Sequence, residues 1–185
     1  MHVMADLEAV TDTAIREFGA RQDPRELTQF LSWLRELPEP PRYVVEVGVY
    51  RGGHLWAMQQ ALPDARFIGV DYSFRYLTNC VFKAGTMLVC GKSAAVAEQV
   101  RGMYEPDQTL VYIDADHGFA GVSRDARLYP ARYQAFHDIN DTRSADHKKL
   151  VCHFYREHQA EFPVTFCNQP NTVGIGVRVS PSVLQ

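Results

Sequence analysis

Residues 43–53 read YVVEVGVYRGG, a short apolar run that holds one acid and is followed by glycines. An apolar, β-branched run of this length is typical of a buried strand. Glycines just beyond its end let the backbone turn tightly and approach a ligand that a Cβ atom would exclude. The stretch therefore predicts a strand and a ligand-binding turn, with the functional site at the carboxyl ends of the strands.

Further apolar runs follow at regular intervals, separated by stretches compatible with helices. This alternation is typical of a parallel sheet built from β-α-β units. Near the end, a helical segment at about 146–160 precedes two runs joined by Asn168-Gln169-Pro170-Asn171, which predicts a hairpin. The sequence thus predicts a doubly wound, Rossmann-like α/β fold with a seven-stranded, mostly parallel sheet and a C-terminal antiparallel hairpin. The expected strands lie at about 43–47, 67–71, 86–90, 110–114, 133–137, 164–167 and 174–179.

Two helices are expected before the first strand. Apolar residues recur at helical spacing within 7–18, and a second such pattern begins after Asp23-Pro24, a helix-start signal. No repeat, linker or low-complexity tract divides the 185 residues. We therefore expect a single domain over 1–185, with an N-terminal helical segment at 1–40 and a Rossmann-like core at 41–185.

Composition narrows the class of protein. The net charge of -3 gives no basic footprint, so nucleic acid is not a favoured partner and a small-molecule acceptor is expected. The four cysteines include no C-x-x-C pair, which predicts reduced thiols, with Cys90 in the core at a strand end. No apolar run reaches the roughly 20 residues needed to cross a membrane. The first twenty residues include several acidic ones, which a signal or transit peptide would avoid. We expect a cytoplasmic protein, and its N-terminal helices could cover the cofactor or form a homo-oligomer interface.

The glycine spacing discriminates between cofactors. The dinucleotide fingerprint G-x-G-x-x-G needs glycines where this chain has Val49-Tyr50-Arg51. The observed Gly48-x-x-x-Gly52-Gly53 leaves less room for a pyrophosphate, yet it can wrap a smaller sulfonium with an amino-acid tail. This spacing, and the lack of room for a substrate domain, disfavour an NAD-dependent oxidoreductase.

These motifs carry a family resemblance. Glu46-x-Gly48-x-x-x-Gly52-Gly53, Asp71 and Ile113-Asp114-Ala115-Asp116-His117 resemble class I S-adenosylmethionine (SAM)-dependent methyltransferases over about residues 40–178. Together with Phe136-His137-Asp138-Ile139, they are similar to the cephalosporin hydroxylase-like and macrolide or sugar O-methyltransferase branch. The resemblance implies SAM as cofactor and O-methylation of a small hydroxylated acceptor, such as a sugar or natural product, with or without a divalent cation (Mg or Mn).

The cofactor would lie against the glycine turn formed by Gly48, Gly52 and Gly53. Asp71 follows that turn by about twenty residues, a spacing at which a carboxylate can accept hydrogen bonds from both ribose hydroxyls. The alternative is a solvated turn acid. For Glu46 the resemblance implies contact with the amino end of the cofactor or with the amides of the loop; a purely structural role is the alternative.

Two further residues are expected on the cofactor. Ser93 opens an Ala-rich stretch and is a natural helix N-cap. The resemblance also places its loop at the adenine, and the two roles are compatible. Asp114, at the end of the fourth strand, is expected to contact both cofactor and metal.

An acidic cluster would carry the chemistry. Asp114, Asp116 and His117 end one strand, and His137 and Asp138 end its neighbour, so a parallel sheet brings them together. Gathered carboxylates repel unless a cation or proton separates them. The resemblance implies metal ligation by Asp114, His137 and Asp138 and a general base at Asp116, while His117 could take the proton instead. An imidazole at His137 suits magnesium less well than manganese, iron or zinc. The set could equally form an acid–base pair, or a structural cation site in a module without catalysis.

Aromatic residues are candidates for the wall of an acceptor pocket, although aromatics at helical spacing are more often core. His54, just past the glycine turn, is more typical of a helix start than of a catalyst. The aromatic candidates are Trp33, Tyr50, Trp56, Phe119 and Tyr129.

Overall fold

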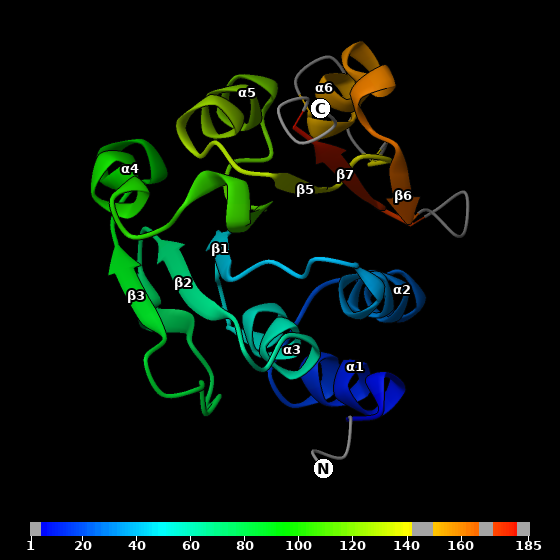
Figure 1. The fold of residues 1–185 in the computed structure, drawn as a ribbon, viewed down its shortest axis with the longest axis vertical. Helices are drawn as coiled ribbons and strands as arrows, with labels where there is room; N and C mark the ends of the chain where they lie inside the picture. Colours follow the sequence, from blue (N-terminus) through cyan, green and yellow to red (C-terminus); the bar gives the residue numbers. More distant parts are fainter. Residues whose placement is uncertain (1–4, 142–149, 167–171, 181–185) are drawn as a thin grey trace.

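The structure is a computed structural model that describes residues 5–141, 150–166 and 172–180. Its strands are β1 (Tyr43–Val47), β2 (Arg66–Asp71), β3 (Met87–Cys90), β4 (Thr109–Ile113), β5 (Tyr133–His137), β6 (Val164–Phe166) and β7 (Ile175–Val179). They form one seven-stranded sheet in the order β3-β2-β1-β4-β5-β7-β6 (Figure 1). Strands β1 to β5 pair in parallel, and β7 is antiparallel to β5 and β6. The predicted fold, with its C-terminal hairpin, is confirmed.

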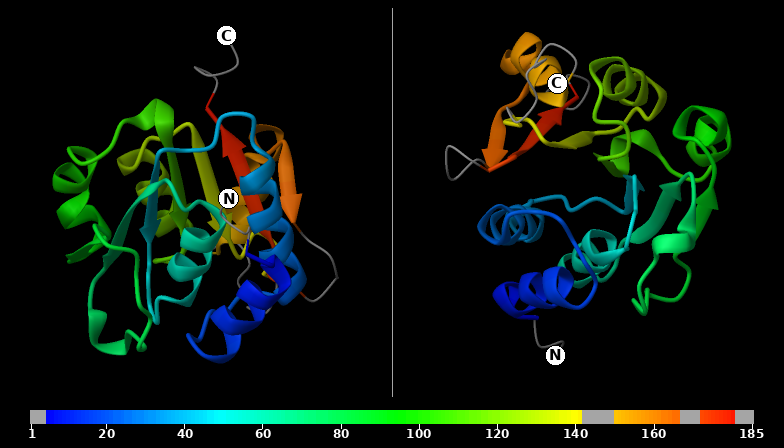
Figure 2. Two further views of the ribbon diagram at one scale, coloured as in Figure 1. Left: turned by 60° about the horizontal axis from the view of Figure 1, so that its bottom comes forward. Right: turned by 180° about the vertical axis from the view of Figure 1, so that it is seen from behind.

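Helices cover both faces of the sheet. They are α1 (Leu7–Arg16), α2 (Pro24–Glu36), α3 (Gly53–Ala61), α4 (Ser93–Arg101), α5 (Phe119–Leu128) and α6 (Val151–Glu157). Helices α1 to α3 pack together on one face and α4 to α6 on the other (Figures 1 and 2).

The two N-terminal helices begin where the sequence predicts. The side chain of Asp6 accepts a hydrogen bond from the amide of Glu8, and Asp23 accepts from the amides of Arg25 and Glu26. At the other end of the chain, α6 covers the later part of the predicted helical segment. Residues 146–149 of that segment and the predicted turn at 168–171 lie outside the described residues.

The core consists of two apolar layers, one on each face of the sheet. Because side chains alternate along a strand, Val44 packs beneath α1 to α3, whereas Val45 and Val47 pack beneath α4 to α6. The same alternation turns Glu46 to the side of Val44. The strand therefore delivers a carboxylate into an apolar layer.

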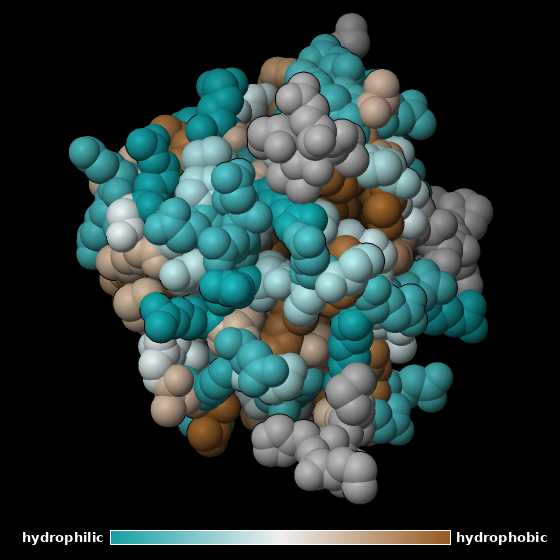
Figure 3. Space-filling model, viewed as in Figure 1, coloured by the Kyte–Doolittle hydropathy of each residue, from teal (hydrophilic) through white to brown (hydrophobic). Residues whose placement is uncertain are grey.

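Strand β3 forms one edge of the sheet, and this corrects one expectation. Cys90 is exposed rather than core, because β3 has a neighbour on one side only and Val89 is its one buried residue. Large exposed apolar side chains gather between residues 72 and 88, although hydrophilic residues cover most of the face seen in Figure 3. No described helix is both long and apolar enough to cross a membrane.

Replacing Gly53 by alanine should destabilise the fold. An added Cβ would lie 2.6 Å from the carbonyl oxygen of Ala14 and 2.8 Å from the amide nitrogen of Ala20, both rigid backbone atoms. Overpacking of this kind costs about 1–3 kcal/mol, to be read from urea unfolding. Gly102→Ala is the matched control, because its Cβ would meet nothing closer than 3.4 Å and its φ is -71°. Equal unfolding free energies of the two variants would contradict the packing role of Gly53.

Candidate active site

A cavity of about 740 Å³ opens at the carboxyl ends of the parallel strands. Every residue expected at the site from sequence lines it: Glu46, Gly48, Gly52, Gly53, Asp71, Ser93, Asp114, Asp116, His117, His137 and Asp138. Residues 19–22, in the connection between α1 and α2, contribute a further wall. This volume is in the range of small-molecule and cofactor sites, which span about 300–1,000 Å³.

The glycine turn is shaped by close backbone contacts. Gly48 has a φ of +103°, and a Cβ there would lie 2.3 Å from the carbonyl oxygen of Asp114. Gly52 has a φ of +88° and precedes α3. Gly48 therefore lets β1 and β4 meet at the cavity floor, and the turn carries the chain into α3 without side chains in the way.

Asp71 holds this turn in place. Its Oδ2 accepts a hydrogen bond from the amide of Tyr50 at 2.8 Å, and its Oδ1 accepts from the amide of Ser73 at 3.0 Å. The residue is 8% exposed, so it is not the solvated turn acid of the alternative interpretation. Each carboxylate oxygen has a second lone pair, and Asp71 lines the cavity, so it can also accept from a ligand's hydroxyls.

Glu46 and His54 form a buried pair beneath the turn. His54 Nδ1 lies 2.7 Å from Glu46 Oε1, and the two residues are 4% and 1% exposed. Within the described part of the chain, Glu46 Oε2 and His54 Nε2 have no hydrogen-bond partner. His54 lies in the first turn of α3, as expected, but no sequence pattern indicates its carboxylate partner. Two orphaned polar atoms in a cavity wall are groups that a bound ligand can satisfy.

The pair holds one proton without net charge. Burial, reinforced by the Asp114 and Asp71 carboxylates, raises the pKa of Glu46 well above its usual value. Burial, followed by the nearby His137, lowers the pKa of His54 to about 3. An isolated charge would be costly to bury here, so a neutral pair is the stable state.

This pair should give stability a maximum at mildly acidic pH. Between the usual pKa values of 4.5 and 6.5, the folded and unfolded chains both hold one proton on these side chains. Above pH 6.5 only the unfolded chain releases it, so unfolding becomes easier by up to about 1.4 kcal/mol per pH unit. Below pH 4.5 only the unfolded chain gains a second proton, so stability falls again.

Urea unfolding at pH 5.5 and pH 8.0 checks this, with Glu46→Gln/His54→Asn as the comparison. The wild-type protein should lose more stability than the double variant between the two values, by up to about 2 kcal/mol. Parallel pH dependence in the two proteins would show that the pair is not protonated in this way.

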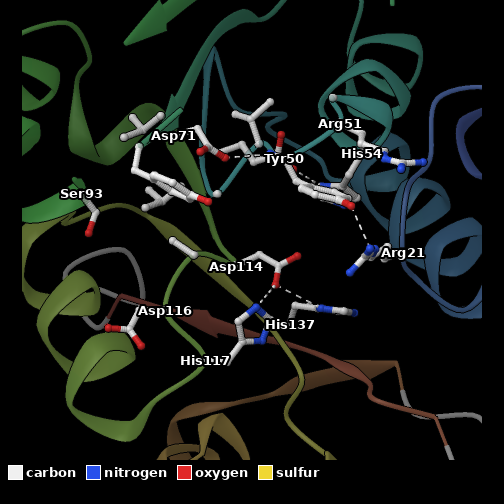
Figure 4. Close-up of a pocket in the computed structure, with 18 of the residues that line it drawn as sticks. Arg21, Tyr50, Arg51, His54, Asp71, Ser93, Asp114, Asp116, His117 and His137 are labelled. Atoms are coloured by element: carbon white, nitrogen blue, oxygen red, sulfur yellow. Dashed lines mark hydrogen bonds and ion pairs between the residues drawn. The ribbon is translucent and has the colours of Figure 1, made fainter. Parts of the chain in front are cut away.

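The acidic cluster forms where β4 and β5 end (Figure 4). His137 Nδ1 lies 3.2 Å from Asp114 Oδ1 and 3.3 Å from Asp138 Oδ1. His117 Nδ1 is hydrogen-bonded to Asp138 Oδ2, and His117 Nε2 lies 3.7 Å from Asp114 Oδ1. Two imidazoles thus separate two carboxylates that would otherwise repel.

These contacts shift the pKa values in opposite directions. The hydrogen bond to Asp138 raises the pKa of His117. Burial opposes ionisation of His137, yet Asp114 and then Asp138 outweigh it and raise the pKa to about 9. Burial likewise opposes ionisation of Asp138, but its bond to His117 and the charge of His137 leave the pKa below its usual value. The cluster is therefore built from charge-paired groups.

The structure brings a second imidazole to the predicted metal-ligating set of Asp114, His137 and Asp138. The donor atoms of Asp114, His117 and Asp138 lie within 4.8 Å of one another, and His137 Nδ1 lies 3.2 and 3.3 Å from the same two carboxylates. Asp116 is directed elsewhere: it accepts from the amide of Gly118 at 3.0 Å and lies 3.6 Å from Arg124. Asp116 thus contacts Gly118, the residue just before α5, and Arg124 within that helix.

Ser93 lines the cavity but is not the N-cap of α4. The cap is Lys92, and Ser93 Oγ instead donates to both carboxylate oxygens of Asp125, at 2.8 and 3.0 Å. The buried carboxylate of α5 competes successfully for the hydroxyl. Ser93 therefore ties α4 to α5.

Besides Lys92, which precedes the predicted Ser93, the cavity is lined by three basic side chains that no sequence motif indicates: Arg21, Arg51 and Arg124. Arg21 comes from the connection between α1 and α2, which only the tertiary fold brings to the strand ends. Of the five aromatic candidates for the wall, Tyr50 alone lines the cavity among the described residues. The other four belong to the core layers or pack against them.

No protein-family model matches the chain, and no curated protein matches it in sequence. Solved structures do match. The O-methyltransferase from Bacillus cereus in complex with S-adenosylhomocysteine (SAH) superposes with a TM-score of 0.61 at 14% identity, covering 97% of this chain and 94% of that one. The O-methyltransferase TomG from Streptomyces achromogenes, involved in tomaymycin synthesis and bound to SAM, gives 0.60 at 14% identity, covering 97% and 92%. The fold is that of the class I methyltransferases.

A third match differs in size. The MycE methyltransferase of the mycinamycin biosynthetic pathway, in complex with Mg and SAH, gives a TM-score of 0.57 at 14% identity, and the match covers 96% of this chain and 49% of that one. The methyltransferase fold thus accounts for nearly all of this chain, and its strand ends are where the cavity and the orphaned polar atoms lie.

Proposed function

We propose that this protein is a SAM-dependent O-methyltransferase of a small hydroxylated acceptor. The observation that carries the proposal is one cavity that joins the glycine turn anchored by Asp71 to the His117–Asp138 pair. The first feature suits a nucleoside with an amino-acid tail. The second suits removal of a proton from a hydroxyl group.

The residues would share the work of binding as follows. Asp71 accepts from the ribose hydroxyls, while Glu46 Oε2 and His54 Nε2, which lack partners in the described chain, offer polar contacts to the tail. Ser93 and Lys92 line the side of the cavity expected for the adenine. When bound, SAM supplies a methyl group that passes to the acceptor oxygen as the carbon–sulfur bond breaks.

His117 would accept the proton of the acceptor hydroxyl. Its Nδ1 is hydrogen-bonded to Asp138 Oδ2, so in the neutral imidazole the proton sits on Nδ1, and Nε2, which lies 3.7 Å from Asp114 Oδ1, carries the lone pair that acts as base. Asp138 then stabilises the imidazolium that forms. Asp116 is less suited to this role, because its oxygens already contact the Gly118 amide and Arg124.

The proposal is tested by titrating the protein with SAH in a calorimeter. We expect saturable binding with one site per chain, and transfer of label from methyl-labelled SAM to at least one hydroxylated acceptor. NADH serves as the comparison cofactor and should not bind. Absence of SAH binding would refute the proposal.

The His117→Gln variant should lose about 100-fold in turnover, the low end of the range for a general base. SAH affinity should change less than about threefold, because His117 lies at the acceptor end. Asp116→Asn is the matched control and should lose less than about tenfold. Steady-state rates with labelled SAM measure both. The reverse ranking would move the base to Asp116.

A divalent cation is an alternative occupant of the same cluster. Asp114, His117 and Asp138 present two carboxylates and one imidazole within 4.8 Å, a donor set that fits Mn²⁺, Fe²⁺ or Zn²⁺ better than Mg²⁺. A bound cation would act as a Lewis acid that lowers the pKa of the acceptor hydroxyl. Dialysis against a chelator distinguishes the cases: turnover through His117 alone survives it, and metal-assisted turnover is restored only by added cation.

A further inference from the structure

The charged side chains of the cavity are unevenly partnered. Apart from Glu46, which the buried pair keeps neutral, its carboxyl groups are engaged: Asp71 by backbone amides, Asp114 and Asp138 by imidazoles, and Asp116 by Arg124. By contrast, Arg21 and Arg51 form no ion pair with any described residue, although both line the cavity. These two guanidinium groups, together with Lys92 next to Ser93, therefore form the part of this site that no described carboxylate neutralises.

Arg21 and Arg51 both lie against Tyr50. Their Cζ atoms lie 4.5 and 5.5 Å from the centre of its ring, and Arg21 Nη2 donates to the Tyr50 hydroxyl at 2.8 Å. Because that oxygen accepts from Arg21, the hydroxyl proton is available for a further acceptor. Tyr50 has a φ of +50°, a strained value for a side-chain-bearing residue, which the Asp71 hydrogen bond maintains.

The position of this group relates it to the reacting end of the cavity. In Figure 4, Arg21, Tyr50 and Arg51 gather on the side opposite Ser93, with Asp114 between the two sides. A ligand that places a hydroxyl at His117 could therefore extend toward the guanidinium groups. Carboxylates are bound well by such planar, bidentate donors.

We propose that the methylated acceptor carries a carboxylate, which Arg21, Arg51 and the Tyr50 hydroxyl bind. This inference rests on the proposed methyltransferase function and specifies its substrate class. The cofactor's own tail brings one carboxylate, but also an ammonium and a neighbouring sulfonium. Two guanidinium groups thus offer more hydrogen-bond donors than the single carboxylate of the cofactor can occupy, and an anionic acceptor can engage the others.

The test compares matched acceptors on SAH-loaded protein. The carboxylated probes are 3,4-dihydroxybenzoate and glucuronate, and their neutral partners are catechol and glucose. We expect calorimetry to detect at least one carboxylated probe, with affinity about tenfold or more above its neutral partner. Arg21→Met and Arg51→Met should each abolish that preference while leaving SAH affinity unchanged. Arg66→Met is the control, because Arg66 also lies over a tyrosine ring, 5.9 Å from the centre of Tyr43, but away from the cavity.

The outcomes separate the two proposals. If the wild-type protein binds SAH but neither carboxylated probe, or binds both members of each pair equally, the acceptor inference is overturned and the methyltransferase proposal stands. If Arg21→Met and Arg51→Met weaken SAH binding by the same factor as probe binding, the arginines hold the cofactor tail instead, which also overturns the inference. If SAH does not bind at all, the failure lies in the proposed function.

Discussion

Asp71→Ala should weaken SAH binding by about 1,000-fold or more. The carboxylate would make hydrogen bonds to two ribose hydroxyls, and bonds to a charged group are each worth about 1.5–3 kcal/mol. The substitution also removes the acceptor for the amide of Tyr50, 2.8 Å away, and for that of Ser73, 3.0 Å away. The glycine turn then loses its anchor, so ligand contact and loop geometry fail together.

Asp71→Asn separates these two contributions. Asparagine keeps the shape of the side chain and one acceptor oxygen, so it can hold one of the two amides but not both. We expect its SAH affinity to lie between those of the wild-type protein and Asp71→Ala in calorimetric titration. If Asp71→Ala leaves the SAH affinity unchanged, Asp71 does not bind the ribose, even if the variant is less stable.

Much of the architecture could be predicted because the pattern of apolar residues, and the spacing between apolar runs, are local properties of the sequence. The run at 43–47 is apolar on both faces, which a strand between two helical layers requires, and the regular return of such runs predicts parallel pairing. The ends of the strands could also be located from the sequence, so Asp71 and Asp114 could be assigned to the same edge of the sheet from the sequence alone. The resemblance of motifs then led to the same fold that the solved structures share with this chain.

The remaining features depend on contacts that no local pattern records. His54 meets Glu46 because the first turn of α3 folds back over β1, and Arg21 reaches the cavity because α1 and α2 pack on the same face as α3. Ser93 donates to Asp125 and does not cap α4, because Asp125 lies beside it on the neighbouring helix α5. Cys90 is exposed because strand order, which the sequence does not state, puts β3 at the edge.

Asp138→Asn should reduce turnover by about 1,000-fold while SAH affinity changes less than about threefold. In the structure, the two oxygens of Asp138 serve different imidazoles: Oδ2 is bonded to His117 Nδ1, and Oδ1 lies 3.3 Å from His137 Nδ1. Asparagine offers one acceptor oxygen and one donor nitrogen. If the amide faces His117, the proton must move to Nε2, and the atom that should accept the substrate proton is blocked.

Asparagine is also the substitution that keeps the backbone conformation at this position. Asp138 has a φ of +63°, a left-handed conformation that asparagine tolerates and alanine resists by about 1–2 kcal/mol. Asp138→Ala should therefore lose stability in urea unfolding as well as turnover, and Asp138→Asn mainly turnover. Single-turnover rates with labelled SAM measure the chemical step apart from product release. A rate in Asp138→Asn within about tenfold of the wild-type value would mean that the His117–Asp138 pair does not handle the proton, and would count equally against a cation that Asp138 helps to bind.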